Sequence, residues 1–373
     1  MKIAVVGHIR FAIAEPFAGG MGAHCAALCK ALSDAGHDIV LFAADGSETA
    51  APLNAICDDP YEDVLPWARW RGTEELARYQ HDSFARGWEA ILSGGFDVVH
   101  NNALFPDLID WAARDSMPML TSQHVPPFGI MRDAVMRAIG DERLQFSVTS
   151  ASQLPLWLQR PASNLGVVHN GIDTAFWQPG EKGGRFLWSG RITPNKGTAD
   201  ALAAAHAAGA ELDIAGTVED EIYFAQHVAP LLDGRRRYIG HLDRAALQAK
   251  VAAARAVVVT PAWDEPFGLV AAEALSCDIP VIAFDRGALS EVVRDCGVIV
   301  PAGDIAALAQ AMQHPPRLAP GAARARAEAC FSLQAMVTGY ERLYRAAIAA
   351  VSHGADTECA DTEYADTECR AVA

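Results

Sequence analysis

Short apolar runs alternate with amphipathic stretches along most of the chain, a pattern typical of β-α units around a parallel sheet. After the first run, Cys25, Leu28, Cys29 and Leu32 fall on one face of a predicted helix that Gly36 ends. In the first half of the chain the predicted strands are residues 3–7, 38–43, 96–100, 118–122 and 145–150.

A second series of apolar runs repeats this architecture, and each run is again followed by a helical stretch. The pattern therefore predicts an α/β protein of two Rossmann-like, doubly wound domains, residues 1–165 and 166–320, joined by a linker at Pro161–Gly171. Two such domains facing each other place the carboxyl ends of both sheets around one cleft, where these folds bind ligands. The predicted strands of the second series are residues 185–190, 211–216, 237–240, 256–261, 280–284 and 297–301.

The end of the chain has a different composition. From Ala355 the pentapeptides ADTEC, ADTEY and ADTEC follow one another, with acidic charge and few apolar side chains. Such a segment buries too little surface to offset the entropy of ordering it, so residues 353–373 are predicted to be disordered. The sequence leaves the role of this tail open.

Composition narrows the class of protein. The 373 residues are 51% apolar and 20% charged, as in packed globular domains, and the net charge of −16 argues against a nucleic-acid partner. The apolar run at Ile3–Val6 is too short for a signal peptide or a membrane span, so we expect a cytoplasmic protein without strong membrane association. The eight cysteines show no CxxC spacing and indicate neither a disulfide framework nor a zinc site.

The stretch TPAWDEPFGLVAAEALSC carries the clearest chemistry. It follows a buried strand, and Pro266 at a first helical position with Gly268 behind it predicts a helix N-terminus. Backbone N–H groups and the helix dipole there suit a diphosphate. A carboxylate before the helix, Glu265, can accept hydrogen bonds from sugar hydroxyls, and one within it, Glu273, can bind a ribose diol.

This stretch resembles the Glu-x7-Glu motif of the retaining family-4 glycosyltransferases, which have the GT-B fold, and the resemblance extends over nearly the whole chain before the tail. SGRITPNKG, residues 189–197, resembles the family element whose Arg and Lys neutralise the donor diphosphate. The resemblance thus assigns Arg191 and Lys196 to the leaving group, and positioned cations do stabilise a departing diphosphate.

Further segments follow the same family. HNGIDTAFW looks like the entry to the C-terminal domain, with Asn170 and Gly171 fixing a turn. The resemblance places the backbone at His241 and Leu242 near the nucleobase, and IAFDRGALSEVV at the edge of the same pocket. In this fold the last helix returns to the N-terminal domain, which we expect of residues 321–352. The donor-binding residues that the resemblance implies around Glu265 are Phe267, Gly268, Leu269 and Val270.

In the N-terminal half, the loop at Gly19, Gly20 and Gly22 resembles the family's glycine-rich loop, which approaches the donor phosphates and sugar. Many members have a larger polar residue where Gly22 stands, which leaves acceptor handling at that position open. His124, at the end of TSQH, resembles the family histidine that contacts the transferred sugar. The acceptor-side candidates that end a neighbouring strand are His100, Asn101 and Asn102.

The sequence contains no Asp-x-Asp, the usual metal-diphosphate ligand pair of the other main glycosyltransferase fold. We therefore expect a metal-independent enzyme without a cofactor, in which Arg191, Lys196 and a helix dipole replace the cation. The resemblance implies retaining transfer of a hexose from a nucleotide-sugar donor to a hydroxyl acceptor, with glucose from UDP-glucose as the working hypothesis. The acceptor, the actual sugar and nucleotide, and the oligomeric state are open.

Three alternatives differ in what they do with the donor. A sugar-nucleotide epimerase can share the two-domain architecture but would change the sugar's stereochemistry without consuming the donor. A nicotinamide-dependent oxidoreductase is suggested by the first strand, the glycine loop and Asp45, although GGMG does not match G-x-G-x-x-G. A non-catalytic sugar-nucleotide sensor would keep the pocket and lack transfer.

Overall fold

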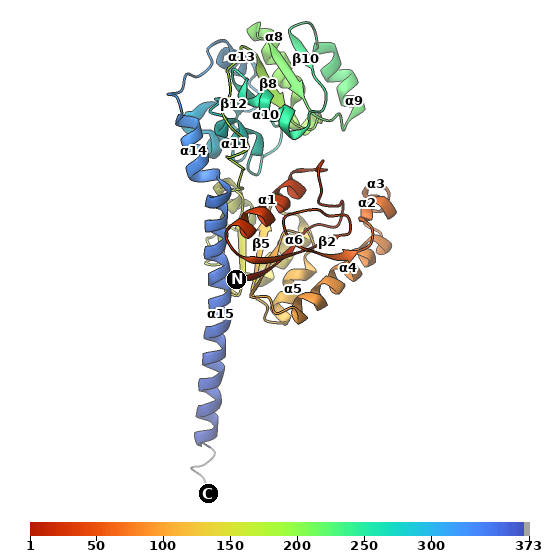
Figure 1. The fold of residues 1–373 in the computed structure, drawn as a ribbon, viewed down its shortest axis with the longest axis vertical. Coiled ribbons are helices and arrows are strands. Elements are labelled where there is room, and N and C mark those ends of the chain that lie inside the picture. The colour runs from red at the N-terminus through yellow and green to blue at the C-terminus, as the bar shows by residue number, and fades with distance from the viewer. Residues whose placement is uncertain (369–373) are drawn as a thin grey trace. The chain divides into compact units, whose positions relative to one another are not determined.

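The chain folds into two compact units. The computed structural model describes residues 1–368, with side chains described through residue 351. The first unit comprises Met1–Val148, Leu154–Val168 and the chain from Val337 onward, and the second comprises Thr149–Gln153 and His169–Met336. Each unit is built around one parallel sheet (Figure 1).

The sheet of the first unit has seven parallel strands in the order β3-β2-β1-β4-β5-β6-β7. The strand order reverses between β1 and β4, which makes their carboxyl ends the place where doubly wound sheets bind ligands. The strands are β1 (Lys2–Val6), β2 (Asp38–Ala44), β3 (Leu53–Cys57), β4 (Val98–Asn101), β5 (Met119–Gln123), β6 (Leu144–Val148) and β7 (Leu165–Val167).

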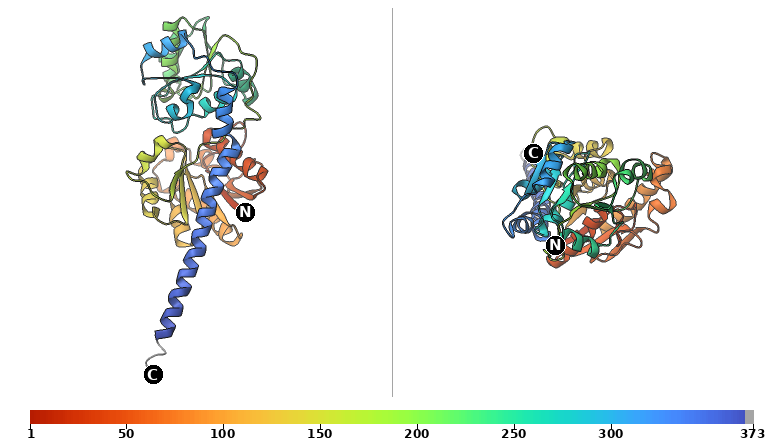
Figure 2. Two further views of the ribbon diagram at one scale, coloured as in Figure 1. Left: turned by 90° about the vertical axis from the view of Figure 1, so that its left-hand side faces the viewer. Right: turned by 90° about the horizontal axis from the view of Figure 1, so that it is seen from above.

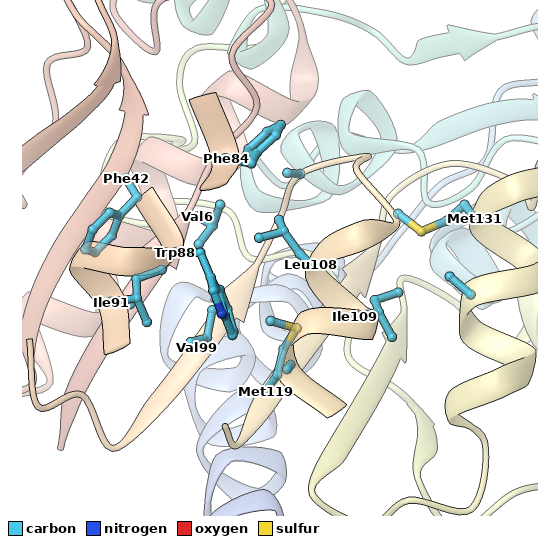
Figure 3. Packing of buried hydrophobic residues seen from close by; sticks show 14 of the residues in the cluster. Val6, Phe42, Phe84, Trp88, Ile91, Val99, Leu108, Ile109, Met119 and Met131 are labelled. Carbon is cyan, nitrogen blue, oxygen red and sulfur yellow. The ribbon is translucent and has the colours of Figure 1, made fainter. Parts of the chain in front are cut away.

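Helices cover both faces of this sheet. On one face, Phe42, Trp88, Ile91 and Val99 pack together between β2, β4 and α4 (Figure 3). Burying each such side chain contributes about 1.5–3 kcal/mol. The helices of this unit are α1 (Gly20–Asp34), α2 (Tyr61–Val64), α3 (Trp67–Trp70), α4 (Glu74–Ser93), α5 (Asp107–Arg114), α6 (Gly129–Ala138), α7 (Leu154–Trp157) and most of α15 (Leu333–Glu368).

The second sheet has six parallel strands in the order β10-β9-β8-β11-β12-β13, so its order reverses between β8 and β11. Alternate residues of its strands enter two separate cores: Phe186 and Trp188 of β8 lie in one, and Leu187 lies in the other. This two-sided burial explains the unbroken apolar runs in the sequence. The strands are β8 (Phe186–Ser189), β9 (Leu212–Ala215), β10 (Arg236–Tyr238), β11 (Val257–Val259), β12 (Val281–Phe284) and β13 (Gly297–Val300).

The helices of the second unit return the chain from the carboxyl edge of the sheet to the start of the next strand. They are α8 (Thr198–Ala208), α9 (Glu221–Tyr223), α10 (Arg244–Ala252), α11 (Leu269–Ser276), α12 (Leu289–Val293), α13 (Ile305–Gln313) and α14 (Ala322–Phe331). The short 3-10 segments are η1 (Ala151–Gln153), η2 (Pro194–Lys196), η4 (Ala229–Leu231) and η5 (Arg294–Cys296), and η3 (Phe224–Val228) is a π-helical turn.

Three details differ from the sequence prediction. Strand β3 was not predicted, and β7 lies inside the segment Pro161–Gly171 that was predicted to be a linker. Pro266 does not occupy the first helical position, because α11 begins at Leu269 after Gly268, whose φ is 90°. A left-handed glycine at that point redirects the chain into the helix.

The end of the chain forms one long helix. From Val337 on, α15 belongs to the first unit: its earlier turns lie beside that unit's strands, where Tyr344 contacts His100 of β4, and its later turns extend past them (Figure 2). Residues 353–368, predicted to be disordered, continue this helix, because Ala and Glu favour helix and the preceding turns supply the nucleus. Residues 369–373 of the predicted tail lie outside the described residues. No helix in the described part of the chain is both long and apolar enough to cross a membrane.

Candidate active site

The loop after β8 brings Arg191 and Lys196 to the point where the second sheet reverses its strand order. Gly197, with φ 68°, allows this loop to contact the end of β11: a Cβ there would lie 1.8 Å from the Thr260 carbonyl oxygen. The Thr260 hydroxyl donates to the Gly197 carbonyl at 2.8 Å and accepts from the Trp188 indole at 3.1 Å. These contacts fix the backbone immediately after Lys196.

Lys196 and Glu265 form an ion pair across this point. Lys196 Nζ lies 2.8 Å from Glu265 Oε2, and the two side chains are 23% and 14% exposed. Trp263 Nε1 donates to the same Oε2 at 3.1 Å, and its ring lies 5.2 Å from Nζ. The structure thus joins two residues that the sequence assigned separately, and adds Trp263, which the sequence analysis did not single out.

The backbone at Glu265 is held by the loop after β12. The Glu265 carbonyl accepts from the Ala288 N–H at 2.8 Å. Gly287 has φ 59°, and a Cβ on it would lie 2.5 Å from the Glu265 nitrogen. Only glycine permits so close an approach, so the segment that was expected at the edge of the pocket supports Glu265 directly.

Helix α11 presents an uncapped N-terminus, with its N-cap three residues after Glu265. Its N-cap, Gly268, offers no side-chain acceptor, and no acidic residue lies in the first turn. The first backbone N–H groups of a helix lack intrahelical acceptors, and they attract anions together with the helix dipole. The carbonyl of Pro266, just before this turn, is anchored by the hydroxyls of Thr149 and Ser150 at 3.0 and 2.8 Å.

Three predicted donor residues lie at the start of this helix: Phe267 precedes it, and Leu269 and Val270 are its first two residues. Phe267 is buried, and its ring packs edge-on against Phe331 at 5.4 Å, so its side chain belongs to the core and can offer only backbone groups to a ligand. Leu269 and Val270 are half-buried against the same core.

Glu273 lies within α11, half-buried. Burial raises the pKa of its carboxyl from 4.5 to about 8, and the positive charge of Arg244 lowers it only in part. The carboxyl is therefore largely protonated at neutral pH in this structure. It can both donate to and accept from the hydroxyls of a diol.

Arg191 does not join the pair of Lys196 and Glu265. Its Nη1 lies 2.6 Å from Glu219 Oε2, and both side chains are about half exposed, at 52% and 50%. Exposed ion pairs are weak, at about 0–1 kcal/mol, so a ligand phosphate can replace Glu219 at little cost.

The predicted nucleobase residues follow β10. His241 is exposed, and its Nδ1 lies 3.3 Å from the Thr217 hydroxyl, while Leu242 is half-buried against the core. Gly216, at the end of β9, sits so close to β8 that a Cβ would lie 1.8 Å from the Gly190 carbonyl oxygen. The carboxyl ends of β8, β9 and β10 therefore form one continuous edge beside Arg191.

In the first unit, α1 begins at Gly20 with Gly19 as an extended N-cap that has no side-chain bond. A Cβ on Gly19 would meet no atom within 4 Å, whereas one on the buried Gly22 would lie 3.7 Å from His8 Nε2 and from Phe17. The predicted glycine loop thus forms an open helix N-terminus at the carboxyl edge of the first sheet.

His124 and Asn102 come together at this edge. His124 Nε2 lies 2.9 Å from Asn102 Oδ1, and burial lowers the pKa of His124 to about 4, so the ring is neutral at physiological pH. His24 of α1, which the sequence analysis missed, lies against it with ring centroids 4.3 Å apart. A histidine on the apolar face of the predicted first helix was the only sequence signal for it.

The other two acceptor-side candidates lie in the interior, contrary to expectation. His100 is fully buried between the hydroxyls of Tyr344 and Ser122, at 2.6 and 2.7 Å. Asn101 is also fully buried, and its Oδ1 accepts from the Ala103 N–H at 2.9 Å. As consecutive residues of β4 they point to opposite faces of the sheet, and both are buried because both faces are covered, so they stabilise the fold.

Within the described residues, no cluster of three or more His, Cys, Asp or Glu side chains is placed to hold a metal ion.

Comparisons with known proteins match both halves of the chain. A family model described as Glycosyltransferase Family 4 matches residues 18–176, and one described as Glycosyl transferases group 1 matches residues 183–314. The chain is 28% identical over 387 aligned positions to a glycogen synthase of Mycobacterium tuberculosis, covering 88% of this chain and 91% of that protein. It is 26% identical to a D-inositol 3-phosphate glycosyltransferase of Mycobacterium bovis, covering 89% and 79%.

Solved structures share the fold. The crystal structure of AviGT4, a glycosyltransferase involved in avilamycin A biosynthesis, superposes with a TM-score of 0.72 at 21% identity, covering 93% of this chain and 98% of that one. HepE of Anabaena superposes with a TM-score of 0.65 at 17% identity, covering 92% and 99%. With both family models matched and the two parallel sheets in place, the chain belongs to the family-4 glycosyltransferases and is a transferase of the GT-B fold.

Proposed function

We propose that this enzyme transfers a hexose from a nucleotide diphosphate sugar to a hydroxyl acceptor, with retention of anomeric configuration and without a metal ion. The observation that carries the proposal is the ion pair of Lys196 and Glu265 beside the uncapped N-terminus of α11. It combines a cation for phosphate, a carboxylate for sugar hydroxyls and backbone N–H groups for an anion at one sheet edge. UDP-glucose is the donor to test first.

The departing diphosphate gains negative charge as the bond to the sugar breaks. Lys196 has three N–H donors and uses one on Glu265, which leaves others for a phosphate oxygen. Arg191 would exchange Glu219 for the diphosphate, and the α11 N–H groups would bind its other oxygens. Removing one such stabilising group typically costs a factor of about 10² to 10³ in turnover.

The covalent change balances without an enzymic nucleophile. The bond between C1 of the hexose and the phosphate oxygen breaks, and its electron pair leaves with the nucleoside diphosphate. The acceptor oxygen bonds to C1 on the same face and gives its proton to the departing phosphate oxygen. Glu265 would hold a sugar hydroxyl through this step, and Glu273 would bind the ribose diol.

On the first unit, the proposal assigns His124 to a sugar hydroxyl. Its Nε2–H donates to Asn102 in the hydrogen-bond arrangement of the structure, so Nδ1 is the acceptor nitrogen, and burial keeps the ring uncharged. A neutral histidine of this kind suits a neutral hydroxyl better than a phosphate. The N-terminus of α1, at Gly19 and Gly20, presents further backbone N–H groups in this unit, and Gly22 adds no side chain beside them.

The relatives support this choice of donor. HepE of Anabaena was crystallised with UDP and glucose, and also with UDP-glucose. The related proteins named glycogen synthase and D-inositol 3-phosphate glycosyltransferase transfer to different acceptors by their names, so these relatives support the reaction class and not one acceptor.

The test incubates the purified full chain with UDP-, GDP- and ADP-sugars in EDTA, with and without cell-extract acceptors, and follows donor and product by mass spectrometry and NMR. We expect loss of one donor, a glycoside product with the donor's anomeric configuration, and no inhibition by EDTA. Conversion of the donor to an isomeric sugar nucleotide would instead identify an epimerase. Inhibition by EDTA that Mg²⁺ reverses would contradict the metal-free mechanism.

A further inference from the structure

Trp263 occupies an unusual position between the two charged groups of the site. Its indole N–H donates to Glu265 Oε2, and its ring lies against the ammonium of Lys196, at the distances given above. Glu265 Oε2 thus accepts from both Lys196 and Trp263, and within the described residues Oε1 accepts no hydrogen bond. One side chain contacts both members of the ion pair through two different interactions.

The backbone around Trp263 is anchored on both sides. The Ala262 N–H donates to the Asn195 carbonyl at 2.9 Å, immediately before Lys196, and the Glu265 carbonyl is held by Ala288. The loop therefore cannot move away from Lys196 without breaking these bonds. With its backbone fixed, the indole has a defined place from which to restrict both neighbouring side chains.

Each restriction has a physical consequence. A glutamate held only by a flexible lysine can exchange its two oxygens, whereas a second donor on Oε2 fixes which oxygen is free. A lysine side chain has about 2 kcal/mol of rotamer entropy, and an aromatic face beside its ammonium limits the rotamers that it samples. Groups held in place before the substrate binds contribute most to transition-state stabilisation.

We propose that Trp263 is a positioning residue for the donor: its N–H directs Oε1 of Glu265 to a sugar hydroxyl, and its ring holds Lys196 where the diphosphate binds. The inference rests on the proposed function and separates two roles of one side chain. The N–H acts on the chemical step through Glu265, and the ring acts on diphosphate affinity through Lys196.

Two substitutions separate the roles. Trp263→Phe keeps an aromatic face for Lys196 and removes the donor to Glu265, while Trp263→Leu removes both. We expect kcat to fall about tenfold or more in both variants, on the scale seen when an electrostatic contact is lost. We expect the Kd for UDP, measured by calorimetry, to be unchanged in Trp263→Phe and severalfold weaker in Trp263→Leu. Trp67→Phe and Trp67→Leu, at an exposed tryptophan of the first unit, are the matched controls.

A double-mutant cycle tests whether the N–H acts through Glu265. In a Glu265→Ala background, Trp263→Phe should cost little further kcat, because the side chain that it orients is gone. Full additivity of the two losses would overturn the positioning role. A UDP affinity equally weak in Trp263→Phe and Trp263→Leu would overturn the role of the ring.

The UDP titration needs no acceptor and no turnover. If no transfer is found with any donor, the proposed function fails, yet a weaker UDP affinity in Trp263→Leu than in Trp263→Phe still supports the contact with Lys196. Equal UDP affinities in wild type and Trp263→Leu would overturn the proposed contact of the ring with Lys196 and leave the role of the N–H untouched. Circular dichroism melts and binding stoichiometry distinguish a lost contact from a loss of folded protein.

Discussion

Replacing Glu273 by glutamine should make the protein less sensitive to alkaline pH. Burial raises the pKa of this carboxyl from 4.5 to about 8, so between those two values the folded chain binds more protons than the unfolded chain. The raised pKa therefore contributes stability that is fully present below pH 4.5 and is lost as pH rises through 8. Glutamine carries no charge and shows no such loss.

The size of the effect follows from the shift. At about 1.36 kcal/mol for each pKa unit, the full shift corresponds to an upper limit of about 4–5 kcal/mol above pH 8. Glu273 is only half-buried, and solvent screening reduces this free energy below its upper limit. We therefore expect the free energy of unfolding of the wild type to fall by about 1–2 kcal/mol more than that of Glu273→Gln between pH 5 and pH 8.

The assay is urea unfolding of wild type and variant at both pH values, followed by tryptophan fluorescence. The difference in free energy of unfolding between wild type and variant is determined at each pH. Subtracting the value at pH 5 from the value at pH 8 removes the contribution of every other titrating group. Glu181→Gln, at an exposed glutamate of the same unit, is the control and should show no pH-dependent difference. If wild type and Glu273→Gln differ in free energy of unfolding by the same amount at both pH values, the reasoning is refuted.

Three further substitutions test the site. Gly197→Ala should destabilise the protein by more than about 3 kcal/mol in urea unfolding, because the added Cβ would meet the Thr260 carbonyl. Its control, Gly209→Ala, has a similar φ of 62° but open space around the new Cβ, and should cost about 1 kcal/mol from backbone strain alone. Glu219→Gln should tighten UDP binding severalfold in calorimetry by releasing Arg191, and unchanged affinity would argue against a phosphate role for that arginine. His124→Gln should lower kcat about tenfold through the lost contact with the transferred sugar and leave the UDP Kd unchanged, and a change confined to UDP would count against its assignment to a sugar hydroxyl.

Most of the fold could be predicted from periodicity, because strands buried on both faces appear as unbroken apolar runs. The two missed strands lack that signal. In β3, Asn54 and Ala55 are exposed at the edge of the sheet, and β7 is three half-buried residues at the opposite edge. An edge strand has only one neighbouring strand and borders solvent on its other side. Its backbone pairing with that neighbour holds it in the sheet, so it can lack the apolar run of a central strand.

The residue types of the site could be predicted, but their pairing could not. Lys196 and Glu265 were both expected near the donor, yet their contact depends on glycines such as Gly197 that let loops distant in sequence touch. No sequence pattern pointed to Trp263, because its importance comes only from its contacts with Lys196 and Glu265 in the folded structure. Arg191 pairs with Glu219, and no sequence pattern gave reason to expect this exposed ion pair between two loops.

The central claim is that Lys196 and Glu265, beside the N-terminus of α11, carry sugar transfer. The most direct test compares turnover of the responsive donor by wild type, Lys196→Ala, Glu265→Gln and the control Lys182→Ala, whose lysine is exposed in the same unit. We predict a loss of kcat of about 10² to 10³ in the two site variants and less than about twofold in the control. Site variants that turn over as fast as the control would contradict the account.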